Sequence, residues 1–93
     1  MRLWNMSDEE IAGLVKSTGA SLYGNFRRDG KKKIVKALPG EHGIDYNLSV
    51  SKNQFGARVL NITLYNPDMP PAFWAKGYRF DDNKAVRYIK VEI

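Results

Sequence analysis

The amino-acid sequence predicts an α+β fold, mostly β, in which one N-terminal helix precedes about six antiparallel strands. Three observations lead to this prediction: a helix-start signal near residue 7, alternation of apolar and polar residues along most of the later chain, and turn residues between the alternating runs. One helix with about six strands is typical of a highly twisted sheet or a small barrel, of which the oligonucleotide-binding barrel is one example.

The helix is expected over residues 8–18. Ser7 and Glu10 have the spacing of a capping box, and the acidic run after Ser7 complements the positive end of a helix. Apolar residues then recur at helical spacing, and Gly19 supplies a C-terminal stop. The acidic run is therefore explained by helix formation rather than by an acidic site.

The first two strands are expected over residues 21–28 and 31–38, joined at Asp29 and Gly30. Glycine tolerates the positive φ of a two-residue hairpin turn, so Asp-Gly between alternating runs favours a hairpin. Four further strands are expected, at IDYNLSVS, ARVLNITLY, AFWAKGYRF and AVRYIKVEI. Alternation puts the following residues on one face of their strand: Ile44, Tyr46, Leu48 and Val50 in the first of these, and Leu60, Ile62 and Leu64 in the second. Residues 21–93 would form the β region of a single domain spanning 1–93.

Composition limits the class of protein. The 93 residues are 43% hydrophobic, which is enough for one core and too much for a disordered chain. The absence of cysteine excludes a disulfide scaffold and a cysteine nucleophile, and it suits a reducing cytoplasm. No segment approaches the roughly 20 apolar residues of a membrane helix, and the N-terminus lacks the apolar centre of a signal peptide. We therefore expect a cytoplasmic protein that does not enter a membrane.

The formal net charge of +5 is concentrated in one segment. Six of the fifteen cations lie in residues 27–36: Arg27, Arg28, Lys31, Lys32, Lys33 and Lys36. A hairpin there would oppose Arg27 to Lys32 and Arg28 to Lys31, at a cost of a few tenths to about 1 kcal/mol per pair. Phosphates between these side chains would reverse the sign of that interaction.

This cluster predicts a non-enzymatic nucleic-acid-binding protein that contacts phosphate backbone or single strands. The six cations would contact phosphates, and Tyr23 and Phe55 are candidates for stacking on bases. Alternatively, the cations extend a hairpin tip into solvent, protect a strand edge from aggregation, or bind a protein partner.

Catalytic and metal sites are not expected. His42 is the only histidine, with no cysteine or second histidine to complete a metal site. Asp81 and Asp82 are adjacent in a turn, where side chains diverge, and no nucleophile or phosphate-cradling glycine motif accompanies them. We expect no enzyme, no cofactor and no metal.

Two stretches, GNFRRDG and FGARVLNITLYNPDMPPAFWA, carry a family resemblance. The matching positions are Gly24, Phe26, Leu60, Ile62, Leu64, Asn66, Pro67 and Pro70. Over about residues 24–75 the chain resembles a family of short plasmid- and phage-encoded proteins of unassigned function. It departs from that family by its N-terminal helix and by lacking a tryptophan before the central strand. The resemblance implies a mobile-element origin, a host-cell cytoplasmic location and a small β-rich domain, but no catalytic residues.

An alternative function rests on the loop NPDMPPAFW. Its prolines stiffen the loop, so that it could present Met69, Phe73 and Trp74 as an apolar surface to a host protein. The protein would then be a phage or mobile-element factor that inhibits or redirects a host protein, for example a defence complex. The same aromatic residues could instead fill the core. A structural or assembly subunit is a third possibility, supported only by the β content.

Overall fold

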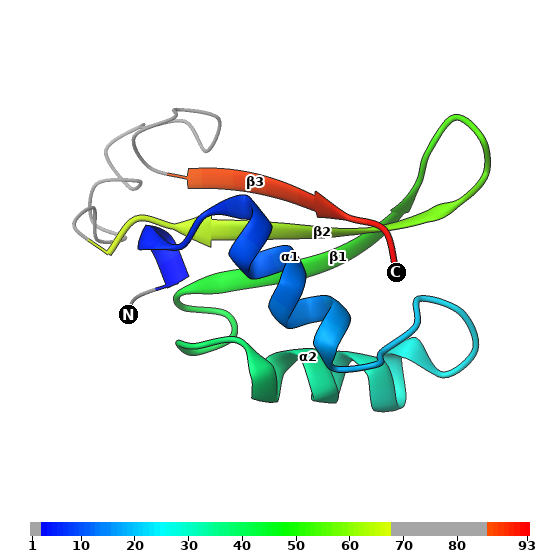
Figure 1. Cartoon of the computed structure of the whole chain (residues 1–93), viewed down its shortest axis with the longest axis horizontal. Helices are drawn as coiled ribbons and strands as arrows, with labels where there is room; N and C mark the ends of the chain where they lie inside the picture. The colour runs from blue at the N-terminus through cyan, green and yellow to red at the C-terminus, as the bar shows by residue number, and fades with distance from the viewer. Residues whose placement is uncertain (1–2, 68–85) are drawn as a thin grey trace.

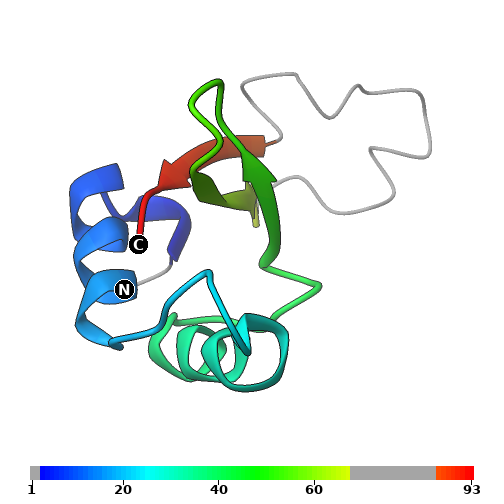
Figure 2. The ribbon, with the colours of Figure 1, turned by 90° about the vertical axis from the view of Figure 1, so that its right-hand side faces the viewer.

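The computed structural model describes residues 3–67 and 86–93 (Figure 1). Its regular elements in chain order are the 3₁₀ turn η1 (Leu3–Asn5), α1 (Asp8–Ser17), the π-helical turn η2 (Phe26–Gly30), α2 (Lys31–Ala37), β1 (Tyr46–Lys52), β2 (Arg58–Tyr65) and β3 (Val86–Val91). The strands form an antiparallel sheet in the order β1-β2-β3. Figures 1 and 2 show α1 and α2 on the same side of this sheet.

The predicted N-terminal helix is confirmed. Helix α1 begins with a reciprocal capping box, in which the Glu10 backbone N–H donates to Ser7 Oγ at 3.2 Å and the Ser7 backbone N–H donates to Glu10 Oε1 at 3.3 Å. The helix ends at Ser17, one residue before the predicted end. Ile11 and Val15 are fully buried, so the helix packs on its apolar stripe.

Three of the predicted strands are also found. The β1–β2 hairpin pairs Tyr46 with Leu64 at one end and Lys52 with Arg58 at the other, and β2 is the central strand. The alternate residues Leu60, Ile62 and Leu64 are fully buried, as expected for a strand with one face on a core. The prediction that Ile44 shares a strand face with Tyr46 is wrong, because Ile44 lies in the turn before β1 and is largely exposed.

The predicted six-stranded sheet or barrel is wrong. Residues 26–37 form one helical segment, η2 followed directly by α2, where two strands were expected. Residues 21–25 belong to an irregular loop between α1 and this segment. The three strands of the described chain form an open sheet, so the fold is a small mixed α+β arrangement. The predicted strand AFWAKGYRF lies outside the described residues.

The helical segment is explained by buried residues that recur at every fourth position. The residues that it and its end bury are Phe26, Gly30, Ile34 and Leu38. A period near 3.6 puts such residues on one helix face, whereas a strand would divide them by alternation. Gly30 has a helical φ of −64° rather than a positive φ. Its lack of a side chain serves packing, since a Cβ there would lie 2.9 Å from Phe26 Cδ2.

One apolar core joins the helices to the sheet. Its buried members are Leu3, Ile11, Val15, Leu22, Phe26, Ile34, Leu38, Tyr46, Leu60, Ile62, Leu64, Ile89 and Val91. The helical layer covers the inner face of the sheet unevenly along β1: Tyr46 is fully buried, Leu48 is partly buried, and Val50 is 39% exposed. The open end of this face, near Val50, is where the candidate site lies. Among the described residues, no helix has the length and apolar character needed to cross a membrane.

Candidate nucleic-acid interface

The six clustered cations lie on a helix rather than on a hairpin. Element η2 contains Arg27 and Arg28, and α2 contains Lys31, Lys32, Lys33 and Lys36. The predicted cross-strand pairing of these residues is therefore wrong. Asp29 is the only acid in the segment. Six cations and one carboxylate give the segment an excess of five positive charges, which equals the formal net charge of the whole chain.

Within the described residues, no carboxylate forms an ion pair with these six cations. Among residues 3–67 and 86–93 the only ion pair is that of Arg87 with Asp8, at 2.6 Å. Lys32 and Lys36 are one turn apart in α2 and both exposed, a like-charge pair that costs a helix about 0.2–0.5 kcal/mol. Cations early in a helical segment also oppose the helix dipole. The repulsion inferred from the sequence therefore persists, with helical instead of cross-strand geometry.

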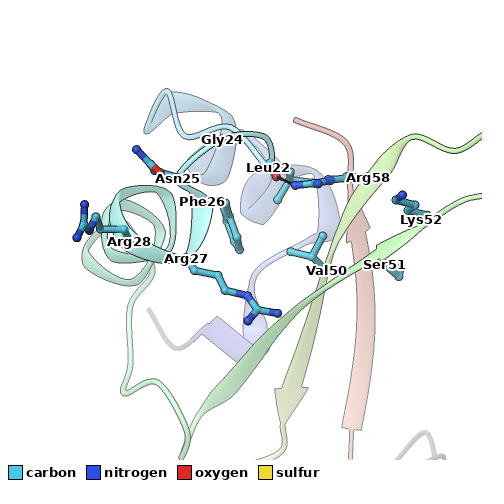
Figure 3. Close-up of a pocket in the computed structure, with 10 residues that line it drawn as sticks. All are labelled: Leu22, Gly24, Asn25, Phe26, Arg27, Arg28, Val50, Ser51, Lys52 and Arg58. Atoms are coloured by element: carbon cyan, nitrogen blue, oxygen red, sulfur yellow. Dashed lines mark hydrogen bonds between the residues drawn. The ribbon is translucent and has the colours of Figure 1, made fainter.

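A depression of about 560 Å³ lies between η2 and the adjoining ends of β1 and β2 (Figure 3). It is lined by Leu22, Gly24, Asn25, Phe26, Arg27, Arg28, Val50, Ser51, Lys52 and Arg58. Figure 3 shows Arg27 extended toward β1, whereas Arg28 and Asn25 point away from the strands. Its ionisable lining residues are all cations.

Two further depressions share lining residues with the first. One, of about 410 Å³, is lined by Phe26, Arg27, Lys31, Leu48, Ser49 and Val50, and the other, of about 370 Å³, is lined by Arg27, Lys31, Lys32, Val35 and Lys36. We call the three together the basic groove. Arg27 lines all three parts and Lys31 lines two of them. Lys33 is exposed but lines none of the three.

The sequence reasoning missed Lys52 and Arg58. They are directly opposed across the β1–β2 hairpin and form a like-charge cross-strand pair. The sequence predicts such pairs at residues 27–32, which are helical, and not at this hairpin. Arg58 Nη1 donates to the Leu22 carbonyl oxygen at 2.9 Å, and its guanidinium lies 5.2 Å from the centre of the Tyr23 ring. Arg58 thereby fixes the loop after α1 against the hairpin. Both residues flank the turn KNQFG, and the register of that hairpin was the signal that could have revealed them.

The two predicted stacking residues do not line the basic groove. The Tyr23 ring is in contact with the Arg58 guanidinium, and its hydroxyl oxygen accepts from the Arg58 backbone N–H at 3.3 Å. Phe55 is 83% exposed in the β1–β2 turn. The structure instead brings Phe26 and Val50 to the groove, as apolar side chains among the cations.

The remaining candidate residues add no second site in the described chain. Met69, Phe73 and Trp74 lie outside the described residues, as do Asp81 and Asp82. The ring of His42 packs edge-on against that of Tyr46, with centroids 5.5 Å apart. Residues 3–67 and 86–93 contain no group of three or more metal-binding side chains.

Tyr46 is the described residue with a shifted pKa. Burial, and secondly the nearby Asp45 carboxylate, raise the pKa of its phenol above the ordinary value of 10.0. Its hydroxyl points at the Val35 carbonyl oxygen, 3.5 Å away, and its ring is part of the core. The shift therefore reflects core packing.

Comparisons with models of protein families, with curated proteins and with solved structures found no match. The resemblance to short plasmid- and phage-encoded proteins accordingly stays a prediction.

Proposed function

We propose that this protein binds nucleic acid without catalysis, holding the phosphate backbone in the basic groove. The observation that carries the proposal is that three depressions share lining residues and that their ionisable lining residues are cations throughout, with Arg27 common to all three. The groove draws these cations from two separate parts of the chain, the helical segment and the β1–β2 hairpin. Cations that converge from two parts of the chain are stronger support for an anion-binding site than a run of charges in the sequence.

The energetics favour a polymeric anion over a single one. Each phosphate that a cation neutralises releases condensed counterions, and the logarithm of the association constant then falls with the logarithm of salt concentration by about 0.7 per phosphate for a single strand. A polyanion lying along the groove would also offset the repulsion between Lys32 and Lys36 and between Lys52 and Arg58. Binding should therefore be strong at low salt and should weaken steeply as salt rises.

Fluorescence anisotropy with labelled single-stranded and duplex oligonucleotides, at about 50 mM and about 200 mM NaCl, tests this proposal. Arg27→Glu should weaken binding at least about tenfold at low salt and reduce the salt dependence, because it removes one contact and adds repulsion. Lys90→Glu makes the same change in net charge, but Lys90 is an exposed residue of β3 that follows the inward-facing Ile89. It should weaken binding by less than about threefold, the long-range effect of net charge alone.

Two outcomes contradict the proposal. If the folded wild-type protein shows no binding at low salt, the basic groove is not a nucleic-acid interface. If Arg27→Glu and Lys90→Glu weaken binding equally, the interaction is nonspecific and is not located in the groove. The alternative of a host-protein inhibitor remains a prediction, because Met69, Phe73 and Trp74 lie outside the described residues.

A further inference from the structure

The basic groove is lined by apolar side chains as well as by cations. The depression between η2 and the hairpin is lined by Leu22, Phe26 and Val50 as well as by cations. Leu22 and Phe26 are buried in the core, so Val50 is the apolar lining residue that is most open to solvent. Figure 3 shows the Phe26 ring and the Val50 side chain facing the same space, with Arg27 extended across it. A phosphate alone would be served by the cations and gains nothing from apolar neighbours.

Val50 is the most informative of these residues. It belongs to the same face of β1 as Tyr46, which is fully buried, yet 39% of its own surface is exposed. Its partner in the hairpin, Leu60, is fully buried. An apolar side chain on the core face of a sheet is thus left open to solvent where the helical layer ends, inside a cationic rim.

Arg58 is held in place before any ligand arrives. Its Nη1 donates to the Leu22 carbonyl oxygen, and its planar group rests on the Tyr23 ring. A guanidinium has five N–H donors, so other donors remain for an anion. The rim of the depression is therefore partly preorganised, which lowers the entropy cost of binding.

A ligand that matches this depression has a flat apolar part beside a negative charge. A nucleotide of a single strand has this character, whereas a duplex keeps its bases stacked inside. We infer that the depression receives one unstacked base against Val50, beside the buried Phe26, while phosphates on either side of that base contact Arg27 and Arg58. This inference rests on the proposed function and makes the protein a single-strand binder that discriminates against duplex.

The test compares two single strands of about twelve nucleotides, within the usual site sizes for such proteins, that have equal numbers of phosphates. One is ordinary oligodeoxythymidine, and the other carries a stable abasic analogue at every position. The ordinary strand should bind at least about threefold more tightly than the abasic strand, because only a base adds apolar contact with Val50. The duplex should bind less tightly than the ordinary strand, since it offers phosphates without a free base.

Val50→Ala locates the effect. It should weaken binding of the ordinary strand by roughly threefold or more and leave binding of the abasic strand unchanged, because it removes apolar contact without changing charge. Ile44→Ala is the matched control: Ile44 is 64% exposed and lies outside the groove, so both strands should bind as they do to wild type. Circular dichroism establishes that each variant is folded.

The outcomes separate this inference from the proposed function. Equal affinity for the ordinary and abasic strands overturns the base site and leaves phosphate binding intact. A poly-glutamate peptide that binds as tightly as the ordinary strand also overturns it, because charge alone would then account for the affinity. Failure of both strands and of the duplex to bind at low salt overturns the proposed function itself.

Discussion

Gly30 is the residue at which local and tertiary requirements differ most. The dipeptide Asp29-Gly30 is a hairpin-turn signal in the sequence, but Gly30 lies inside a helical segment. A Cβ at this position would meet the Phe26 ring and the Ser21 carbonyl oxygen. The glycine is needed for close approach and not for its freedom of φ.

We therefore expect Gly30→Ala to destabilise the protein. A Cβ would lie 2.9 Å from Phe26 Cδ2 and 3.2 Å from the Ser21 carbonyl oxygen, and the Phe26 ring is buried and has little room to move. Overpacking of this kind costs about 1–3 kcal/mol, which exceeds the gain of up to about 1 kcal/mol in helix propensity. Urea denaturation measures the difference.

Gly13→Ala is the control for that measurement. Gly13 is an exposed residue of α1, and a Cβ there would have nothing within 4 Å. The same substitution should therefore stabilise the protein by up to about 1 kcal/mol through helix propensity alone. Stabilisation by both substitutions would show that Gly30 is not constrained by Phe26.

At the scale of elements, Arg87 joins the first part of the chain to the last strand. Its guanidinium donates to the carbonyl oxygens of Trp4 and Met6, forms an ion pair with Asp8, and lies 5.8 Å from the centre of the Trp4 ring. Arg87 thus connects β3 to η1 and to the start of α1. These contacts hold the N-terminal segment over the end of the core.

Arg87→Met should destabilise the protein by about 2–3 kcal/mol in urea denaturation, because two backbone carbonyl oxygens lose a charged donor. Asp8→Asn should cost about 1 kcal/mol or less, because the Asp8 side chain is 67% exposed and such ion pairs contribute little. Equal effects from Asp8→Asn and Arg87→Met would mean that the ion pair, rather than the carbonyl contacts, holds the segment.

The elements differ in how far the sequence predicts them. Helix α1 is predictable because its capping box and acidic first turn are local, and β1, β2 and β3 are predictable because their alternation is regular. The segment of η2 and α2 was misassigned because a two-residue turn signal was given more weight than the four-residue spacing of Phe26, Gly30 and Ile34. What makes that spacing decisive is packing against the sheet, which is a tertiary effect.

The candidate site was only half predictable for a related reason. The clustered cations are visible in the sequence, and the structure brings Arg27 and Lys31 into the groove. Lys52 and Arg58 join them only because the hairpin folds back to the loop after α1, through contacts such as that between Arg58 and Leu22. A site built from contacts between distant segments cannot be read from either segment alone.

At the scale of the whole molecule, the excess of positive charge is carried by one helical segment beside one hairpin end. Self-repulsion of this kind destabilises the folded state, and salt screens it: the Debye length falls from about 30 Å at 0.01 M to about 3 Å at 1 M. We therefore expect the free energy of unfolding, measured by urea denaturation, to rise with NaCl concentration. This behaviour is opposite to that of a fold stabilised by surface ion pairs.

Lys32→Gln distinguishes local repulsion from a general effect of salt. It removes a charge one turn from Lys36, so it should stabilise the protein by about 0.2–0.5 kcal/mol at low salt, with the gain fading as screening increases. Lys90→Gln removes the same charge from β3, where Lys90 is paired with the neutral Asn61, and should have less effect at every salt concentration. If the two variants respond to salt identically, the repulsion is spread over the whole surface. The helical segment would then not be a preferred binding site for a polyanion.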